Sequence, residues 1–182
     1  MLKQLTIIVA LVCGFSLNVA NAEQAMEKAR KLSATQVVQE VLKDPTNPDH
    51  VRPYIAEDFT YVSLNFENKD LQKIMPWAGT HKGPEGFYET FKGVNKFWNV
   101  DEFKPTVAFD DGENVAIFGT FTLTSKTLHK TRTSPFAIQA KVKNGKLTYF
   151  MYMEDTFATA DTFKASGKSI YKSNPDGGQV EY

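Results

Sequence analysis

The dominant period of the hydrophobic pattern changes after Trp98, and this change constrains the fold more than any other feature. Before Trp98, apolar residues recur every three or four positions, which is typical of amphipathic helices. After it, apolar and polar residues alternate, which is typical of strands. Asn144-Gly145, the strongest hairpin signal in the chain, joins the last two strands. Helices gathered ahead of a run of strands predict an α+β fold, a curved antiparallel sheet wrapped by N-terminal helices.

The N-terminal half is expected to hold three main helical segments. The spacing predicts a helix over residues 23–43 and a second, opening at Gly83-Pro84. Between them, residues 48–56 predict a short helix that Pro53 kinks or splits. Residues 69–75 are expected to add one or two helical turns.

The expected strands begin inside this helical half. Residues 59–66 predict the first strand, with Tyr61 and Asn65 on the same face. Residues 76–83 are expected to form a loop that holds Trp77 and His81. The later strands are expected at residues 100–109, 115–123, 135–143 and 147–155.

Residues 1–22 have the features of a secretory signal. Lys3 gives a positive start, an apolar run follows, and Ala20-Asn21-Ala22 forms an A-x-A cleavage site. Cleavage after Ala22 removes the only cysteine, Cys13, so we expect a periplasmic or secreted protein without disulfides. No second apolar run is long enough to span a bilayer, so no membrane partner is expected after cleavage. The remaining chain divides into a folded domain over residues 23–164 and a polar, loosely ordered tail over residues 165–182.

The composition excludes some classes of partner and favours another. The 21 basic and 21 acidic residues balance, whereas a nucleic-acid binder needs a clustered positive surplus, so no nucleic-acid partner is expected. The 14 Phe, 7 Tyr and 2 Trp residues are an unusually large share for a single domain. Aromatic walls with a few polar groups are typical of sites for small molecules. The sequence therefore favours a small apolar or aromatic ligand.

Two ionisable residues are candidates for acid-base catalysis. Asp155, after the last strand, can act as a general base if burial raises the pKa of its carboxyl group; alternatively, it caps the following helix. Strand alternation places Glu154 on the opposite face, so only one of these two carboxylates can enter a pocket. His81 can assist because the pKa of histidine is ~6.5, although it can equally be a solvated loop residue. The three histidines match no metal-ligand spacing and no cofactor motif is present, so we expect neither a metal nor a cofactor.

A second group of residues is expected to hold the ligand. Tyr61 and Asn65 can donate hydrogen bonds to a ligand oxygen, or they can be an ordinary packing residue and a strand-end turn. Several aromatic side chains can line the pocket, although any one of them can instead belong to the core. The aromatic candidates are Trp77, Phe87, Phe91, Trp98, Phe118 and Tyr152.

One segment carries a resemblance to a known family. Residues 76–87, PWAGTHKGPEGF, resemble the PWAGT-x-x-G-x-x-G segment of SnoaL-like proteins, which belong to the superfamily named for nuclear transport factor 2. The resemblance covers about residues 23–163 and implies a cone-shaped α+β barrel with a deep apolar pocket. It also implies dimers through the outer sheet face, and it matches Asp155 to the acidic residue of the closing strand. Further similar segments are residues 114–119, 144–147 and 152–156.

Three functions follow from these features. The first is an exported protein that binds a small apolar or aromatic molecule in a hydrophobic pocket. The second is an acid-base enzyme (an isomerase, cyclase, dehydratase or hydrolase) that uses the same pocket. The third is an interaction module that dimerises through the outer face of its sheet. If the pocket is catalytic, the side chain of Asp155 and that of at least one of His81, Tyr61 and Asn65 are expected to converge on one point of the cavity.

Overall fold

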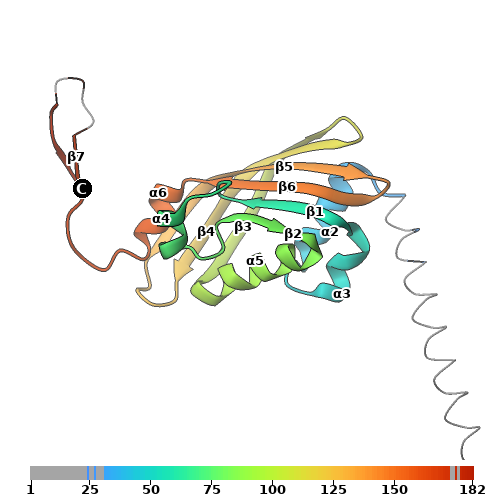
Figure 1. Ribbon diagram of the computed structural model, residues 1–182, viewed down its shortest axis with the longest axis horizontal. Coiled ribbons are helices and arrows are strands. Elements are labelled where there is room, and N and C mark those ends of the chain that lie inside the picture. The colour runs from blue at the N-terminus through green and yellow to red at the C-terminus, as the bar shows by residue number, and fades with distance from the viewer. Residues whose placement is uncertain (1–23, 25–26, 28–30, 173–174, 176) are drawn as a thin grey trace, which may run out of the picture.

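The computed structural model describes residues 24, 27, 31–172, 175 and 177–182 (Figure 1). The expected export signal, residues 1–22, lies outside these described residues. The α+β fold is confirmed: a curved sheet forms the body, and helices cover one of its faces (Figure 1). In the described part of the chain, none of the helices is both long and apolar enough to cross a membrane.

The sheet has six strands in the order β2-β1-β6-β5-β4-β3. Its two edges, β2 and β3, do not pair with each other, so the sheet is curved but not closed. Neighbouring strands are antiparallel except β1 and β6, which are parallel, so the sheet is mixed and not wholly antiparallel as expected. The strands are β1 (Ile55–Ser63), β2 (Gly79–Lys82), β3 (Trp98–Asp110), β4 (Asn114–Ser125), β5 (Thr131–Lys143) and β6 (Lys146–Glu154).

Helices α2, α3 and α5 lie below the sheet in Figure 1, and α6 lies at its far end. Pro53 falls in a 3₁₀ turn, Arg52–Tyr54, so the segment that was expected to be kinked or split is divided at this point. The core fills the space between the helices and the concave sheet face. The helices are α2 (Ala34–Lys43), α3 (Pro48–Val51), α4 (Lys69–Ile74), α5 (Gly83–Phe97) and α6 (Thr156–Asp161).

Among the expected boundaries that differ from the structure, two have local causes. The first helix was expected over residues 23–43; residues 24 and 27 are helical, but the helix is interrupted at residues 31–33 and α2 begins at Ala34. Ser33 and Gln36 form a capping box there, in which each side chain accepts a hydrogen bond from the other's backbone N–H, and this stops the helix from extending further back. The loop expected at residues 76–83 contains β2, since His81 pairs with Tyr61 on β1.

The tail forms a small hairpin that stands away from the body in Figure 1. Its strands are β7 (Ile170–Tyr171) and β8 (Val180–Glu181), and Gly177, with φ of 77°, lies in the turn between them. The pairing covers two residues of each strand, and the loose order expected for the tail as a whole stays a prediction. The ring of Tyr182 packs 4.9 Å from that of Phe157, which ties the hairpin to α6.

Candidate functional site

A cavity of about 610 Å³ lies between the concave sheet face and α5. Its deeper side chains are buried, whereas Asn95, Asn99 and Lys126 are exposed at its rim. Five of the residues predicted for the site line it: Tyr61, Trp77, Phe91, Trp98 and Tyr152.

Three stacked rings lie on the sheet side of this site, and the outer two, Phe103 and Tyr152, line the cavity. The ring of Phe136 lies 4.5 Å from that of Phe103 and 5.7 Å from that of Tyr152, and both pairs are nearly parallel. Phe121 packs edge-on against Tyr152. Phe103 and Phe121 line the cavity but were missed by the sequence analysis. Phe103, Phe121 and Tyr152 give the cavity an aromatic wall on the sheet side, which suits an apolar or aromatic ligand.

The carboxyl group inside the cavity belongs to Glu154. Burial is the main cause that raises its pKa from 4.5 to about 7, and the negative charge of Asp155 raises it further. The Thr159 hydroxyl, 2.7 Å from Glu154 Oε1, acts in the opposite direction because it stabilises the charged form. Near neutral pH this carboxyl group can therefore both accept and release a proton.

Two phenol groups share the cavity with Glu154. Burial raises the pKa of Tyr61 and that of Tyr152, and the charge of Glu154 raises both further. Both phenols therefore stay neutral and keep their O–H groups as donors. Donors beside a proton acceptor can stabilise negative charge on a ligand oxygen.

Asp155, the predicted base, does not line the cavity. Its exposed side chain caps α6, and its Oδ1 accepts hydrogen bonds from the backbone N–H groups of Phe157 and Ala158, each at 3.1 Å. The expectation that it faces a pocket is therefore corrected, and its alternative as a helix cap matches the geometry. One of the two adjacent carboxylates does enter the cavity, but it is Glu154.

The sequence contained the signal for Glu154. Side chains two positions apart on a strand share a face, so Tyr152 and Glu154 must point the same way. Tyr152 and Asp155 were both placed in the pocket, and a regular strand does not allow this. The same alternation puts Phe121 on the inner face of β4 and Phe118 on the outer face.

His81 and Phe87 lie behind the cavity wall and do not form part of it. His81 Nε2 donates a hydrogen bond to the carbonyl oxygen of Trp77 at 2.8 Å, which braces the segment that carries Trp77. Phe87 is fully buried in the core, with its ring 5.8 Å from that of Tyr61. The acid-base partnership proposed for His81 with Asp155 has no geometric support here.

Asn65 also lies outside the cavity lining, because the strand ends before it. Leu64 adopts φ of 67°, and the Asn65 backbone N–H donates back to the carbonyl oxygen of Ser63 at 2.8 Å. This tight turn breaks the alternation that placed Asn65 on the same face as Tyr61. Asn65 Oδ1 is buried and has no hydrogen-bond partner among the described residues.

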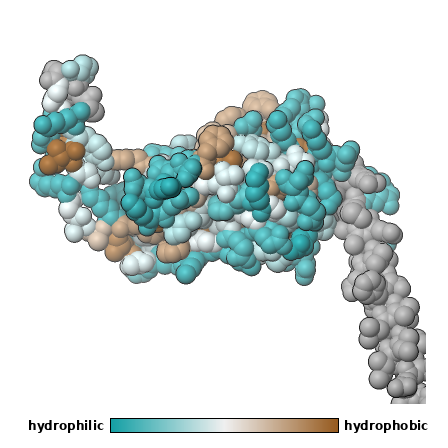
Figure 2. Space-filling view, in the orientation of Figure 1, coloured by the Kyte–Doolittle hydropathy of each residue, from teal (hydrophilic) through white to brown (hydrophobic). Residues whose placement is uncertain are grey.

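Phe118 lies on the outer face of the sheet and is 46% exposed, so its predicted place in the pocket is corrected. Its neighbours across the sheet on that face are Val107, Ala137 and Met153. Val107 and Met153 are also exposed. Figure 2 shows hydrophobic side chains among polar ones along the upper edge of the body, where the sheet lies in Figure 1.

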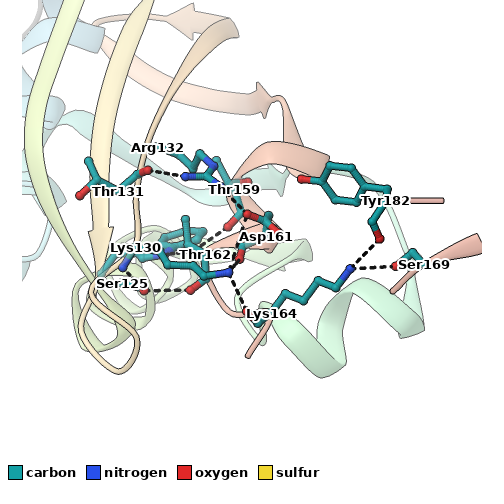
Figure 3. Close-up of polar contacts among 11 residues, drawn as sticks. Ser125, Lys130, Thr131, Arg132, Thr159, Asp161, Thr162, Lys164, Ser169 and Tyr182 are labelled. Atoms are coloured by element: carbon teal, nitrogen blue, oxygen red, sulfur yellow. Dashed lines mark hydrogen bonds and ion pairs between the residues drawn. The ribbon is translucent and has the colours of Figure 1, made fainter. Parts of the chain in front are cut away.

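Helix α6 is held against the sheet by a group of polar contacts (Figure 3). Arg132 donates to Asp161 Oδ2 at 2.6 Å, and Ser125 donates to the carbonyl oxygen of Thr162 at 2.9 Å. The indole N–H of Trp98, in the cavity wall, donates to the Thr162 hydroxyl at 2.9 Å. These contacts fix the segment that carries Thr159 relative to the cavity.

Among the described residues, no group of three or more His, Cys, Asp or Glu side chains is arranged to hold a metal ion. Lys126 is the one cation among the lining residues, and its ammonium group donates to the carbonyl oxygen of Asn95. The polar groups of the site are thus the carboxyl group of Glu154, the phenols of Tyr61 and Tyr152, the hydroxyl group of Ser63 and a polar rim.

No protein-family model matches the chain. It is 46% identical over 145 residues to patulin synthesis protein F of Aspergillus clavatus, a match that covers 76% of this chain and 73% of the relative. The chain belongs to the patulin synthesis protein F family. Patulin biosynthesis cluster protein F of Penicillium expansum, another family member, is 40% identical over 148 residues, which cover 78% of this chain and 74% of that protein.

Solved structures place this family in a larger fold group. An NTF2-like protein of Burkholderia thailandensis matches with a TM-score of 0.62 at 20% identity, over 73% of this chain and 98% of that one. A SnoaL-like polyketide cyclase of Jannaschia matches with a TM-score of 0.54 at 16% identity, over 73% and 94%. The expected NTF2-like fold is confirmed.

Proposed function

We propose that the protein is an acid-base enzyme that moves a proton within a small, flat, oxygen-bearing molecule, with Glu154 as the acid-base group. The observation that carries this proposal is the buried Glu154 carboxyl group inside an aromatic-walled cavity. A carboxyl group used only for packing would be costly to bury there, whereas a proton-transfer group benefits from a pKa near the working pH. The names of the two relatives support a role in the biosynthesis of a small metabolite.

The proton balance of this reaction needs no external reactant. Glu154 takes a proton from the carbon beside a ligand carbonyl group. The electron pair of the broken C–H bond forms a C=C bond, and the π pair of the C=O bond moves onto the carbonyl oxygen. The O–H groups of Tyr61 and Tyr152 are the donors available to stabilise that oxygen. Protonated Glu154 then returns the proton to another ligand atom, which regenerates the carboxylate. The aromatic walls hold the ring and exclude water.

Binding and proton transfer can be tested without knowing the natural substrate. Trp77 and Trp98 are the only tryptophans in the chain and both line the cavity, so a bound ligand should change the intrinsic fluorescence. We expect some members of a panel of cyclic enones and hydroxyquinones to bind and then to take up deuterium from D₂O. Uptake should rise with pH through about 7, because only the ionised carboxyl group accepts a proton. A panel that neither alters fluorescence nor exchanges faster than in buffer would oppose the proposal.

We also propose that the first 22 residues direct export. The positive start, the apolar run and Ala20-Asn21-Ala22 support this, and the expected mature protein is periplasmic or secreted. Expressed in a secreting host, the protein should appear outside the cytoplasm with a mass that corresponds to a start at Glu23. Changing Ala20 and Ala22 to bulky residues should block processing. Full-length protein retained inside the cells that carry the unchanged signal would contradict this proposal.

The outer sheet face supports a further proposal, that two copies of the chain associate through it. Phe118, Ala137 and Met153 form a row of apolar side chains across β4, β5 and β6, two of them exposed. Light scattering should give a dimer for the unchanged protein and a monomer for Phe118→Lys. Phe66→Lys, a matched change of an exposed phenylalanine in the turn after β1, should leave the dimer intact. A monomeric unchanged protein would refute the proposal.

A further inference from the structure

The hydroxyl group of Thr159 occupies an unusual position between two acceptors. Thr159 is fully buried on α6, and its Oγ1 lies 2.7 Å from Glu154 Oε1 and 3.2 Å from the carbonyl oxygen of Asp155. A threonine hydroxyl has one hydrogen and two lone pairs, so it can donate to only one of these oxygens at a time. The choice between them depends on whether Glu154 carries a proton.

When Glu154 is ionised, it offers only acceptors, and the Thr159 hydroxyl donates to it. When Glu154 is protonated, its O–H needs an acceptor. Thr159 Oγ1 can then accept that bond while its own hydrogen turns to the Asp155 carbonyl oxygen. Both forms of the carboxyl group are satisfied by a rotation of one hydroxyl group, without a shift of α6 or β6.

We propose that Thr159 is a positioning residue whose hydroxyl serves both protonation states of Glu154, as donor to the carboxylate and as acceptor from the carboxylic acid. The inference rests on the proposed function, since a group that takes a proton and returns it must be held in place in both states. The anchoring of α6 supports it. Asp161 is held by Arg132, and Thr162 is held by Trp98 and Ser125, so Thr159 cannot follow Glu154 by moving its backbone.

The other groups near Glu154 are not placed to donate to its carboxylate and then accept from its protonated form. The titratable groups beside it are Tyr61 on β1, Tyr152 on β6 and Asp155 at the start of α6. Asp155 is engaged with the backbone of α6. Lys126, at the cavity rim, donates to the Asn95 carbonyl oxygen. The side chain that β5 pairs opposite Glu154 is Phe136, which carries no polar atom.

The titration of Glu154 can be followed directly by carbon-13 NMR of its carboxyl group in the ligand-free protein, with Glu154→Gln to assign the signal. Thr159→Val replaces the hydroxyl with a methyl group of similar size. It should raise the titration midpoint by about one pH unit, because hydrogen bonds to charged groups are stronger than neutral ones. Thr159→Ser should restore the midpoint of the unchanged protein.

Thr90→Val is the matched control. Thr90 is also buried on a helix and donates to the carbonyl oxygen four residues earlier, but it lies on α5 and is not bonded to Glu154. It should leave the midpoint unchanged. An unchanged midpoint in folded Thr159→Val would overturn the role of Thr159 and leave the proposed function standing. A midpoint near 4.5 in the unchanged protein would overturn the proposed function and this inference with it.

A second measurement needs no substitution at Thr159. In the unchanged protein, the carbonyl carbon of Asp155 should titrate with the same midpoint as Glu154, because it gains the Thr159 hydroxyl bond as Glu154 is protonated. This transition should disappear in Glu154→Gln. If the carbonyl signal of Asp155 did not respond to the titration of Glu154, the proposed change of the Thr159 hydroxyl from donor to acceptor would be overturned. This result would hold even if Thr159→Val failed to fold.

Discussion

Glu154→Gln should make the folded protein more stable at pH 8 and remove its proton-transfer activity. The pKa of Glu154 is about 7 in the folded protein and 4.5 when unperturbed. Above pH 7 the folded state must hold a buried charge, which costs about 3 kcal/mol at ~1.4 kcal/mol per pH unit. Glutamine has nearly the same shape and carries no charge. Deuterium uptake by any ligand that the protein exchanges should fall at least ~100-fold, as for the loss of a general base.

The direction of the pH effect follows from proton linkage. Between pH 4.5 and about 7, folded Glu154 binds a proton more tightly than unfolded Glu154, so the free energy of unfolding falls as the pH rises. This contribution is fully present below pH 4.5 and lost above about pH 7. Glu154→Gln should therefore match the unchanged protein near pH 4 and exceed it by up to about 3 kcal/mol at pH 8. Urea unfolding at both pH values measures the difference.

Asp155→Asn is the matched control, since it makes the same chemical change one residue later. Asparagine caps helices as well as aspartate, so α6 should be retained and stability should change by less than about 0.5 kcal/mol. Activity should persist, because Asp155 lies outside the cavity. If Asp155→Asn abolished exchange while Glu154→Gln retained it, the assignment of the base would be reversed.

Local patterns predicted much of the fold because they depend on few residues. The alternation in β4, β5 and β6 matched the structure, and Asn144-Gly145 forms the expected turn with φ of 53° and 75°. The parallel pairing of β1 with β6 was missed. It joins segments more than 80 residues apart, and no local pattern specifies which distant strand fills a sheet edge.

The site was harder to predict because strand alternation defines two faces without saying which is covered. On β4 both faces carry aromatic rings, and only the packing of the helices makes Phe121 internal and Phe118 external. On β1 the alternation itself fails, because Leu64 takes a left-handed conformation that no sequence signal announced. On β6, in contrast, the alternation held, and applying it from Tyr152 would have identified Glu154.

Gly119→Ala should destabilise the protein by about 3 kcal/mol, the upper end of the usual cost of overpacking. Gly119 lies within β4, between Pro105 on β3 and Phe136 on β5. A Cβ atom there would lie 2.3 Å from the carbonyl oxygen of Lys104 and 2.7 Å from the ring of Phe136. The backbone oxygen cannot rotate away, and the ring is confined in its stack between Phe103 and Tyr152.

Gly119→Ala should weaken ligand binding as well as lower stability, because the displaced Phe136 ring stacks on Tyr152 in the cavity wall. We therefore expect Gly119→Ala to lower the midpoint of urea unfolding and to weaken binding of any ligand that changes tryptophan fluorescence. Ala116→Val adds carbon atoms to the outer face of the same strand, beside Phe109, and should change stability by less than about 1 kcal/mol. A Gly119→Ala protein as stable as the unchanged one would mean that β3 is free to move away from β4, and that the aromatic wall beside Glu154 is not rigid.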